Sequence, residues 1–221
     1  MGQGSGAKNG WRRKVHGRLT RDVATSSDTV RLVRWMAARA SRFEFDLGSA
    51  LIGQAARLAE AGRRDDALLA IDEAIDIGRR RAGAEPAKYE PNLAISLLRK
   101  GFWLADADRV DEALRALGDA AVIFRRLVPT DPARFEPALF TALTALGAWR
   151  HNHDQPVEAL PALREAVGIC RRLVVRAPNR HEPDLATALD NLAICLRALG
   201  QAEEAVPVAA ESVLIRHRAN R

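Results

Sequence analysis

Residues 135–139 read Phe135-Glu136-Pro137-Ala138-Leu139, and this stretch decides the fold because close copies of it recur along the chain. Each copy has an aromatic residue or His, then Glu, and a Leu at its fifth position. The copies begin at residues 43, 89, 135 and 181, so consecutive copies are 46 residues apart. Self-similarity at a fixed period of this size is typical of a stacked repeat array. The sequence therefore predicts a repeat architecture before any local motif is considered.

The composition is that of an ordinary globular protein with an aliphatic core. Of 221 residues, 48% are hydrophobic and 28% charged, whereas only 5% are aromatic. No run approaches the roughly 18 apolar residues that a membrane span needs, and the first residues lack the apolar core of a signal peptide. We therefore expect a cytoplasmic protein. Cys170 and Cys195 are too few for a disulfide framework or a zinc site, and we expect both to be buried.

The positive charge is concentrated at the N-terminal end. Residues 1–42 hold ten Lys or Arg and two Asp or Glu, which gives them a net charge of +8. The whole chain has a net charge of +6, so the remaining residues carry −2. Residues 1–25 are rich in Gly and basic residues without hydrophobic periodicity, which predicts a disordered arm. Such an arm either contacts nucleic acid or another acidic surface, or is simply solvated.

Each repeat is predicted to contain two helices, and the repeats span residues 43–88, 89–134, 135–180 and 181–221. The first helices are expected at 46–60, 92–106, 138–152 and 184–198. The second helices are expected at 64–82, 110–128, 156–175 and 202–219. Pro91, Pro137 and Pro183 are expected near the first helical position, where a missing N–H costs nothing. Pro86, Pro132 and Pro178 are expected in the linkers between repeats.

Turn residues and a leading helix complete the pattern. The breaks between paired helices fall at Gly62, Asp108, Asp154 and Gly200, which are residues that tolerate left-handed backbone geometry. Residues 26–42 are predicted to form a capping helix, a half repeat that begins near Ser26. A shift by one period places Arg34 in register with Arg80.

The repeats hold small residues in fixed columns. One column is Ala67, Ala113, Ala159 and Ala205, and another is Ala55, Gly101, Gly147 and Ala193. Large residues fill a complementary column of Leu51, Leu97, Leu143 and Leu189. Small residues at fixed sites let helix axes approach closely, so we expect these columns to form the contacts within and between hairpins.

These columns resemble the tetratricopeptide repeat, an Ala-rich helical hairpin. Asn191-Leu192-Ala193, Leu199-Gly200 and Glu203-Glu204-Ala205 are the pieces most similar to the family pattern. The resemblance covers about residues 43–221 and implies an all-α, right-handed α-solenoid of four hairpins plus the leading helix. The period is longer than the family's usual 34 residues. It is similar to that of arrays attached to regulatory ATPases and signalling proteins of high-GC bacteria.

The resemblance also implies a function, because the family binds peptides on the concave face made by its first helices. We therefore expect a non-catalytic scaffold that binds a protein or peptide there. The expected partner-binding residues are Ile95, Leu98, Arg99, Phe102, Trp103, Thr141, Trp149, Thr187, Asp190, Asn191 and Ile194. The alternative is that Leu98 and Phe102 merely pack between repeats. A second functional hypothesis is a regulator that contacts nucleic acid through the basic arm.

Other motifs predict structure rather than chemistry. Arg79-Arg80, Arg125-Arg126 and Arg171-Arg172 recur near helix ends. They form either a basic stripe for a polyanion or, in our interpretation, partners for the recurrent Glu44, Glu90, Glu136 and Glu182 and for the helix dipole. His151 and His153 indicate a surface turn rather than a metal site. No phosphate loop or nucleophile motif is present, so we expect no enzyme, metal or cofactor.

The last repeat carries apolar residues where a polar cap is usual. They are Val206, Val208, Val213, Leu214 and Ile215. Either two copies pair through this face, or a partner covers it, or the basic residues Arg216, His217 and Arg218 suffice to solvate it.

Overall fold

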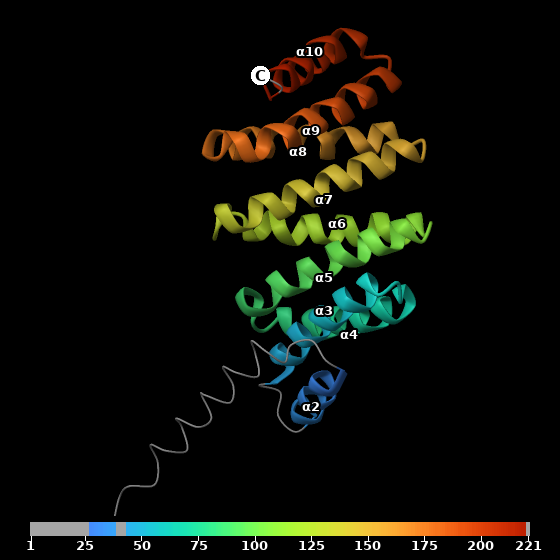
Figure 1. Cartoon of the computed structure of the whole chain (residues 1–221), viewed down its shortest axis with the longest axis vertical. Helices are drawn as coiled ribbons and strands as arrows, with labels where there is room; N and C mark the ends of the chain where they lie inside the picture. Colours follow the sequence, from blue (N-terminus) through green and yellow to red (C-terminus); the bar gives the residue numbers. More distant parts are fainter. Residues whose placement is uncertain (1–26, 39–42, 220–221) are drawn as a thin grey trace, which may run out of the picture. The chain divides into compact units, whose positions relative to one another are not determined.

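The structure is a computed structural model, and it describes residues 27–38 and 43–219. The predicted basic arm, its junction with the capping helix, and residues 39–42 lie outside the described residues. All regular structure in the described part is helical (Figure 1). The helices are α2 (Ser27–Ala37), α3 (Glu44–Glu60), α4 (Arg64–Ala82), α5 (Pro86–Asp106), α6 (Val110–Leu127), α7 (Pro132–Asn152), α8 (Pro156–Arg176), α9 (Pro178–Ala198) and α10 (Ala202–Ala219).

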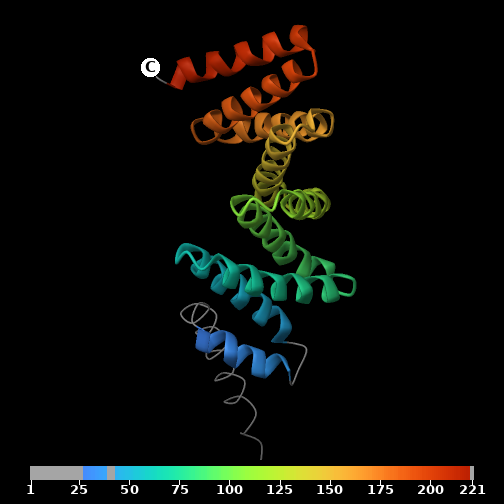
Figure 2. The ribbon, with the colours of Figure 1, turned by 90° about the vertical axis from the view of Figure 1, so that its right-hand side faces the viewer.

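The chain divides into two compact units, and the boundary between Ser96 and Leu97 falls within α5. In the first unit, α2 packs on α3, which pairs with α4. In the second unit, α6 packs on α7, α7 pairs with α8, and α8 contacts α9. Helices α9 and α10 form the last hairpin and lie side by side in both ribbon views (Figures 1 and 2). No described helix is both long and apolar enough to cross a membrane.

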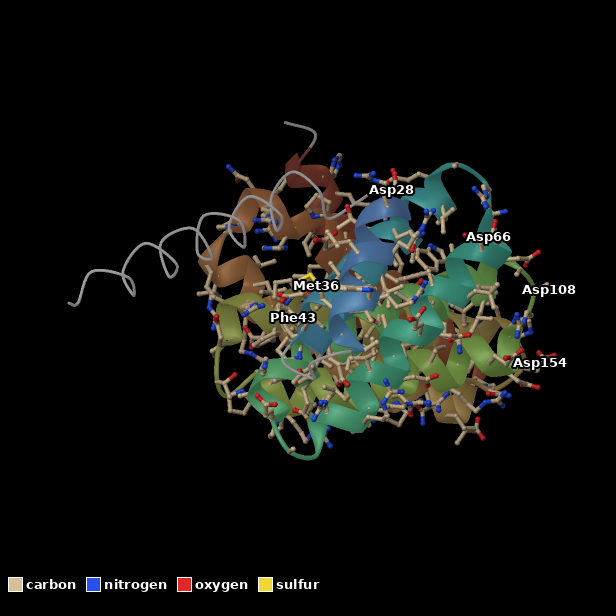
Figure 3. All side chains as sticks on the ribbon, turned by 90° about the horizontal axis from the view of Figure 1, so that it is seen from below. Asp28, Met36, Phe43, Asp66, Asp108 and Asp154 are labelled. Carbon is tan, nitrogen blue, oxygen red and sulfur yellow. The ribbon has the colours of Figure 1, made fainter. Side chains whose placement is uncertain are left out.

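One short turn joins the two helices of each of the four hairpins, and the sequence analysis identified the key residue of each turn. Gly62 and Gly200 have φ of 77° and 73°, and Asp108 and Asp154 have φ of 59° and 57°. Figure 3 labels both aspartates on their turns. Glycine adopts this left-handed conformation without strain and Asp tolerates it better than most residues, so each turn reverses the chain within a few residues.

The predicted first-helix starts were wrong in three repeats. Helices α5, α7 and α9 begin at Pro86, Pro132 and Pro178, so these prolines start helices instead of lying in linkers. A proline at the first position needs no N–H partner, and it keeps the preceding residue out of the helical region. At α7 the start is also capped, because Asp131 Oδ1 accepts a hydrogen bond from Arg134 N–H at 3.1 Å.

The second proline of each repeat therefore lies inside the helix. Pro91, Pro137 and Pro183 are each five residues after the first proline of their helix. Each removes one backbone hydrogen bond. In α5 and α7 the aromatic residue two positions earlier anchors this part of the helix in the core. Tyr89 and Phe135 are buried, and Tyr89 contacts Phe45 edge to face with the ring centroids 5.7 Å apart.

The predicted columns form the core. Their members Ala67, Ala113, Ala159, Leu51, Leu143 and Leu189 are all buried. Gly101 and Gly147 lie against the large residues of the paired helix: a Cβ at Gly147 would be 2.5 Å from Leu163 Cγ. The alternation of small and large residues thus interlocks the two helices of each hairpin.

Candidate protein-binding site

Two first helices of the second unit, α5 and α9, share one surface pattern at equivalent positions. On α5, Arg99 is followed one turn later by Phe102, and on α9, Asn191 is followed by Ile194. Both apolar side chains are exposed, Phe102 by 36% and Ile194 by 46%. Residues three apart lie on one face of a helix, so each helix presents a polar and an apolar group together.

The polar groups of this pattern are available to a ligand. Within the part of the chain that the structure describes, neither the guanidinium of Arg99 nor the side-chain amide of Asn191 has a hydrogen-bonding or ionic partner. Arg99 offers donors only, whereas Asn191 offers both a donor and an acceptor. A peptide backbone needs both kinds of partner, and Asn191 supplies them.

Helix α7 presents small residues at the same two positions. They are Ala145 and Ala148, both half-buried, and α7 contacts α9. Small side chains leave room beside the larger residues of the neighbouring first helix. The equivalent positions thus carry small side chains on α7 and exposed apolar side chains on α5 and α9.

Two buried polar atoms without a partner lie on this same helix. Among the described residues, Thr144 Oγ1 and His151 Nδ1 are the buried side-chain atoms that lack a hydrogen bond. They are seven residues apart, which is two helical turns, so both lie on one side of α7. Leaving a polar atom unpaired typically costs about 1–3 kcal/mol.

The other predicted partner-binding residues fall into two groups. Several are committed to intramolecular contacts: Thr141 and Thr187 donate to the carbonyl oxygens of Pro137 and Pro183, and Asp190 is bound by Arg216. Trp149 is half-buried and stacks on His153 with the ring centroids 5.8 Å apart.

The remaining predicted residues are half-buried on α5. Leu98 and Trp103 belong to the second unit, whereas Ile95 belongs to the first. The second unit therefore leaves Arg99 and Phe102 on α5, and Asn191 and Ile194 on α9, available to a partner.

The arginine ladder is largely paired with carboxylates, in two columns rather than one. Glu136 binds Arg172, as predicted for the Glu column, and also Arg176, whereas Glu44 binds Arg81, which follows the ladder residues Arg79-Arg80. A second column escaped the sequence analysis. Arg125 binds Glu165 at 2.7 Å, and Arg171 binds Glu211 at 2.6 Å, each joining successive second helices.

The same column corrects the register of the capping helix. Arg34 binds Glu73, which is 39 residues ahead, where Arg125 and Arg171 bind carboxylates 40 residues ahead. Arg34 is thus equivalent to Arg79, Arg125 and Arg171, and not to Arg80 as the unmodified period predicts. The sequence already contained evidence for this column, because Glu165 and Glu211 are 46 residues apart and Glu73 lies two such periods before Glu165.

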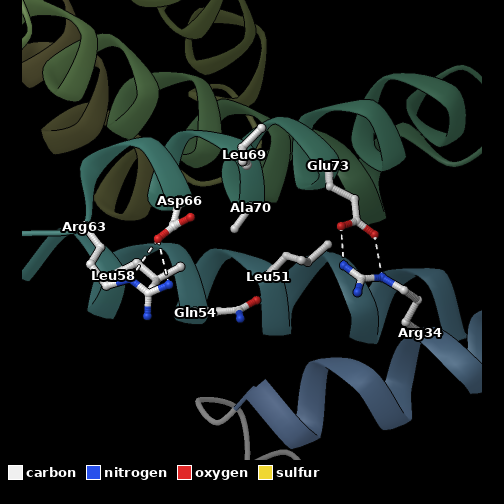
Figure 4. Close-up of a pocket in the computed structure, with 9 residues that line it drawn as sticks. All are labelled: Arg34, Leu51, Gln54, Leu58, Arg63, Asp66, Leu69, Ala70 and Glu73. Carbon is white, nitrogen blue, oxygen red and sulfur yellow. Dashed lines mark hydrogen bonds and ion pairs between the residues drawn. The ribbon is translucent and has the colours of Figure 1, made fainter. Parts of the chain in front are cut away.

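A pocket of about 260 Å³ opens in the first unit between α2, α3 and α4 (Figure 4). Its apolar lining includes Leu51, Leu58 and Leu69.

The charged side chains at this pocket pair with one another. Arg34 binds Glu73, and Arg63 Nε donates to Asp66 Oδ2 at 2.8 Å (Figure 4). The position equivalent to Asp66 in the last hairpin is Glu204, which Arg164 of α8 binds at 2.7 Å. The pocket therefore has an apolar floor and a neutralised rim, which disfavours a strongly charged ligand.

Both cysteines are structural. Cys170 Sγ lies 3.7 Å from the carbonyl oxygen of His181, and Cys195 Sγ donates to that of Pro156 at 3.2 Å. Burial raises the pKa of the Cys170 thiol to about 12 and also raises the pKa of Cys195. Both thiols therefore stay protonated at neutral pH. Among the described residues, no group of three His, Cys, Asp or Glu side chains is placed to hold a metal ion.

Comparison with known proteins places this geometry among helical repeat proteins. Residues 185–220 match the model of the tetratricopeptide repeat family. The nearly identical TPR-like repeats of a Podosopora anserina protein described as a kinesin light chain are 18% identical, with 97% of this chain and 94% of that chain covered and a TM-score of 0.59.

Two further solved structures have the same fold. MamA is 13% identical over 99% of this chain and 98% of its own, with a TM-score of 0.54. BtubC from P. vanneervenii is 16% identical over 88% and 89%, with a TM-score of 0.52. A search of curated proteins found no match to this chain. At these identities the likeness shows the fold, an all-α solenoid of helical hairpins.

Proposed function

The chain carries tetratricopeptide repeats, and from this premise we propose that it is a non-catalytic scaffold that binds a protein or peptide on the first-helix face of its second unit. The observation that carries the proposal is the repeated pair of a polar and an exposed apolar side chain, Arg99 with Phe102 and Asn191 with Ile194. The pair occurs on the first helices of the second and fourth repeats, where it offers a partner an apolar contact beside an unpaired polar group.

The chemistry of the face favours one kind of ligand. An extended or helical segment would place apolar side chains on Phe102 and Ile194 and would hydrogen-bond its backbone to Asn191. Arg99 adds a preference for an acidic or polar group near Phe102. One unpaired arginine does not make a strong clamp for a terminal carboxylate, so we propose recognition of an internal segment.

Proximity labelling followed by titration calorimetry tests this proposal. Proteins enriched by wild type over an unfused labelling enzyme would be produced as peptides and titrated against wild type, Phe102→Asp, Asn191→Ala and Ile194→Asp. We expect each variant to bind at least about tenfold more weakly, since each removes one central contact.

A matched control comes from the second helices. Val175 on α8 is 84% exposed, so Val175→Asp changes a comparable surface residue away from the face. It should bind like wild type. A partner that binds Phe102→Asp and Asn191→Ala as tightly as wild type would contradict the proposal.

A further inference from the structure

The outward face of α10 is apolar, and one of its exposed positions is buried in the preceding second helices. Val213 is 62% exposed, whereas the equivalent Val167 of α8 and Ala121 of α6 are 3% and 2% exposed. Val206 and Leu214 are also exposed, by 68% and 59%. In α8 this position belongs to the hydrophobic cluster formed with α9. No described residue covers it on α10.

The exposed residues are arranged symmetrically about Ala210. Val206 precedes it by four residues, Val213 and Leu214 follow it by three and four, and all are exposed. Spacings of three, four and seven place residues on one face of a helix. The face is therefore an apolar stripe with a small residue at its centre.

Charges of opposite sign lie at the two ends of the stripe. Glu203 is seven residues before Ala210, and His217 and Arg218 are seven and eight residues after it. Other charged residues of α10 form ion pairs within the chain: Glu204 binds Arg164, Glu211 binds Arg171, and Arg216 binds Asp190. In the described chain, Glu203, His217 and Arg218 form no ion pair.

We propose that α10 pairs antiparallel with α10 of a second copy, with the two-fold axis at Ala210. Reversal about this point places Val206 against Val213 and Leu214 of the second copy. It also places each Glu203 against the basic end of the other helix. An isologous contact requires such a self-complementary surface. Ala210 on the axis lets the helices approach to the short end of the usual range of about 8–10 Å.

This pairing is independent of the proposed peptide site, because none of its residues lies on the first-helix face. Failure of one proposal therefore leaves the other standing. Phe102→Asp should weaken peptide binding and leave the assembly unchanged.

Light scattering coupled to size exclusion measures the assembly. Wild type should elute with twice the 24.2 kDa mass of one chain. The double variant Val206→Glu/Val213→Glu should elute as a single chain, and Val175→Glu should behave as wild type. A wild-type mass of one chain at all concentrations, or a double variant with the wild-type mass, overturns the proposal.

A charge swap tests the antiparallel orientation. Glu203→Arg alone and His217→Glu/Arg218→Glu alone bring like charges together in their homodimers, so each should associate at least about tenfold more weakly. An equimolar mixture of the two variants brings opposite charges together at both ends and should restore the dimer. A mixture that remains as dissociated as its components overturns the orientation.

Disulfide formation locates the axis. Helix axes within the usual range of about 8–10 Å, each with Cα atoms at a radius of about 2.3 Å, place facing Cα atoms on the two-fold axis at most about 5.4 Å apart, which is close enough for a disulfide. Ala210→Cys should therefore form a covalent dimer under mild oxidation, while Val175→Cys should not. Cys170 and Cys195 are buried and give no background. Equal cross-linking of both variants, or none at Ala210→Cys, contradicts the proposed axis.

Discussion

Glu136 Oε1 accepts a hydrogen bond from Arg172 Nε at 2.7 Å, although the Glu136 side chain is only 3% exposed and that of Arg172 is 54% exposed. The second carboxylate oxygen is bound by Arg176 at 2.5 Å. One buried carboxylate is thus held by two arginines that remain half in solvent. An unpaired Glu136 carboxylate would be shielded from water, whereas unpaired Arg172 and Arg176 side chains would be solvated, so the loss of either partner should cost a different free energy.

We predict that removing the arginines costs more than removing the glutamate. Arg172→Ala/Arg176→Ala leaves a buried charge without a partner, which should lower the free energy of unfolding by about 3–5 kcal/mol. Glu136→Gln leaves two arginines that water can solvate and should cost about 1–2 kcal/mol. Urea unfolding followed by circular dichroism measures both. Equal losses would contradict the asymmetry.

We predict opposite effects for two Gly→Ala substitutions in helices. Gly147→Ala places a Cβ 2.5 Å from Leu163 Cγ in a packed core and should destabilise by about 1–3 kcal/mol. Gly168→Ala meets no atom within 4 Å and should stabilise by up to about 1 kcal/mol through helix propensity. Thermal unfolding of both variants tests the close approach. A stable Gly147→Ala would mean that these helices are further apart.

The turn between α9 and α10 should require glycine. Gly200 has φ of 73°, so Gly200→Ala forces a Cβ into a left-handed conformation and should cost about 1–2 kcal/mol. Asp154→Gly at φ 57° should be neutral or slightly stabilising, because Gly relieves that strain but gains freedom in the unfolded chain. Denaturant midpoints of the two variants provide the comparison.

The cysteines should be inert in the folded protein. Burial raises the pKa of the Cys170 thiol from 9.0 to about 12, so the reactive thiolate is rare at pH 8. A thiol reagent should modify neither cysteine until urea unfolds the chain. Rapid labelling of native protein would show that the hairpins around Cys170 and Cys195 open locally.

The raised thiol pKa also predicts a pH dependence. The folded state holds its proton up to about pH 12, whereas the unfolded thiol loses it near pH 9, so the stability contribution falls as pH rises between these values. Cys170→Ala should therefore lose less stability than wild type across this window. Urea midpoints at pH 8.5 and pH 10.5 measure the difference, and identical pH profiles would contradict it.

Repetition made much of the fold predictable from single residues. Asp108 and Asp154 marked turns because their equivalents are glycines, and the structure gives all four a positive φ. The Ala and Leu columns marked the core, because only positions held in contact keep one size through successive repeats. The positions of Phe102 and Ile194 in one column also followed from the period, although their exposure did not.

The sequence by itself determined the period, the hairpin turns and the core columns, since local backbone preference and side-chain size act within each repeat. Only the tertiary structure decided that helices begin at Pro86, Pro132 and Pro178, because either proline of a repeat is compatible with a helix start. It also decided that Arg34 pairs with Glu73, and that Val213 is exposed where Val167 is buried. Pairing and exposure depend on which neighbour packs against a helix, and a residue's own repeat does not specify its neighbour.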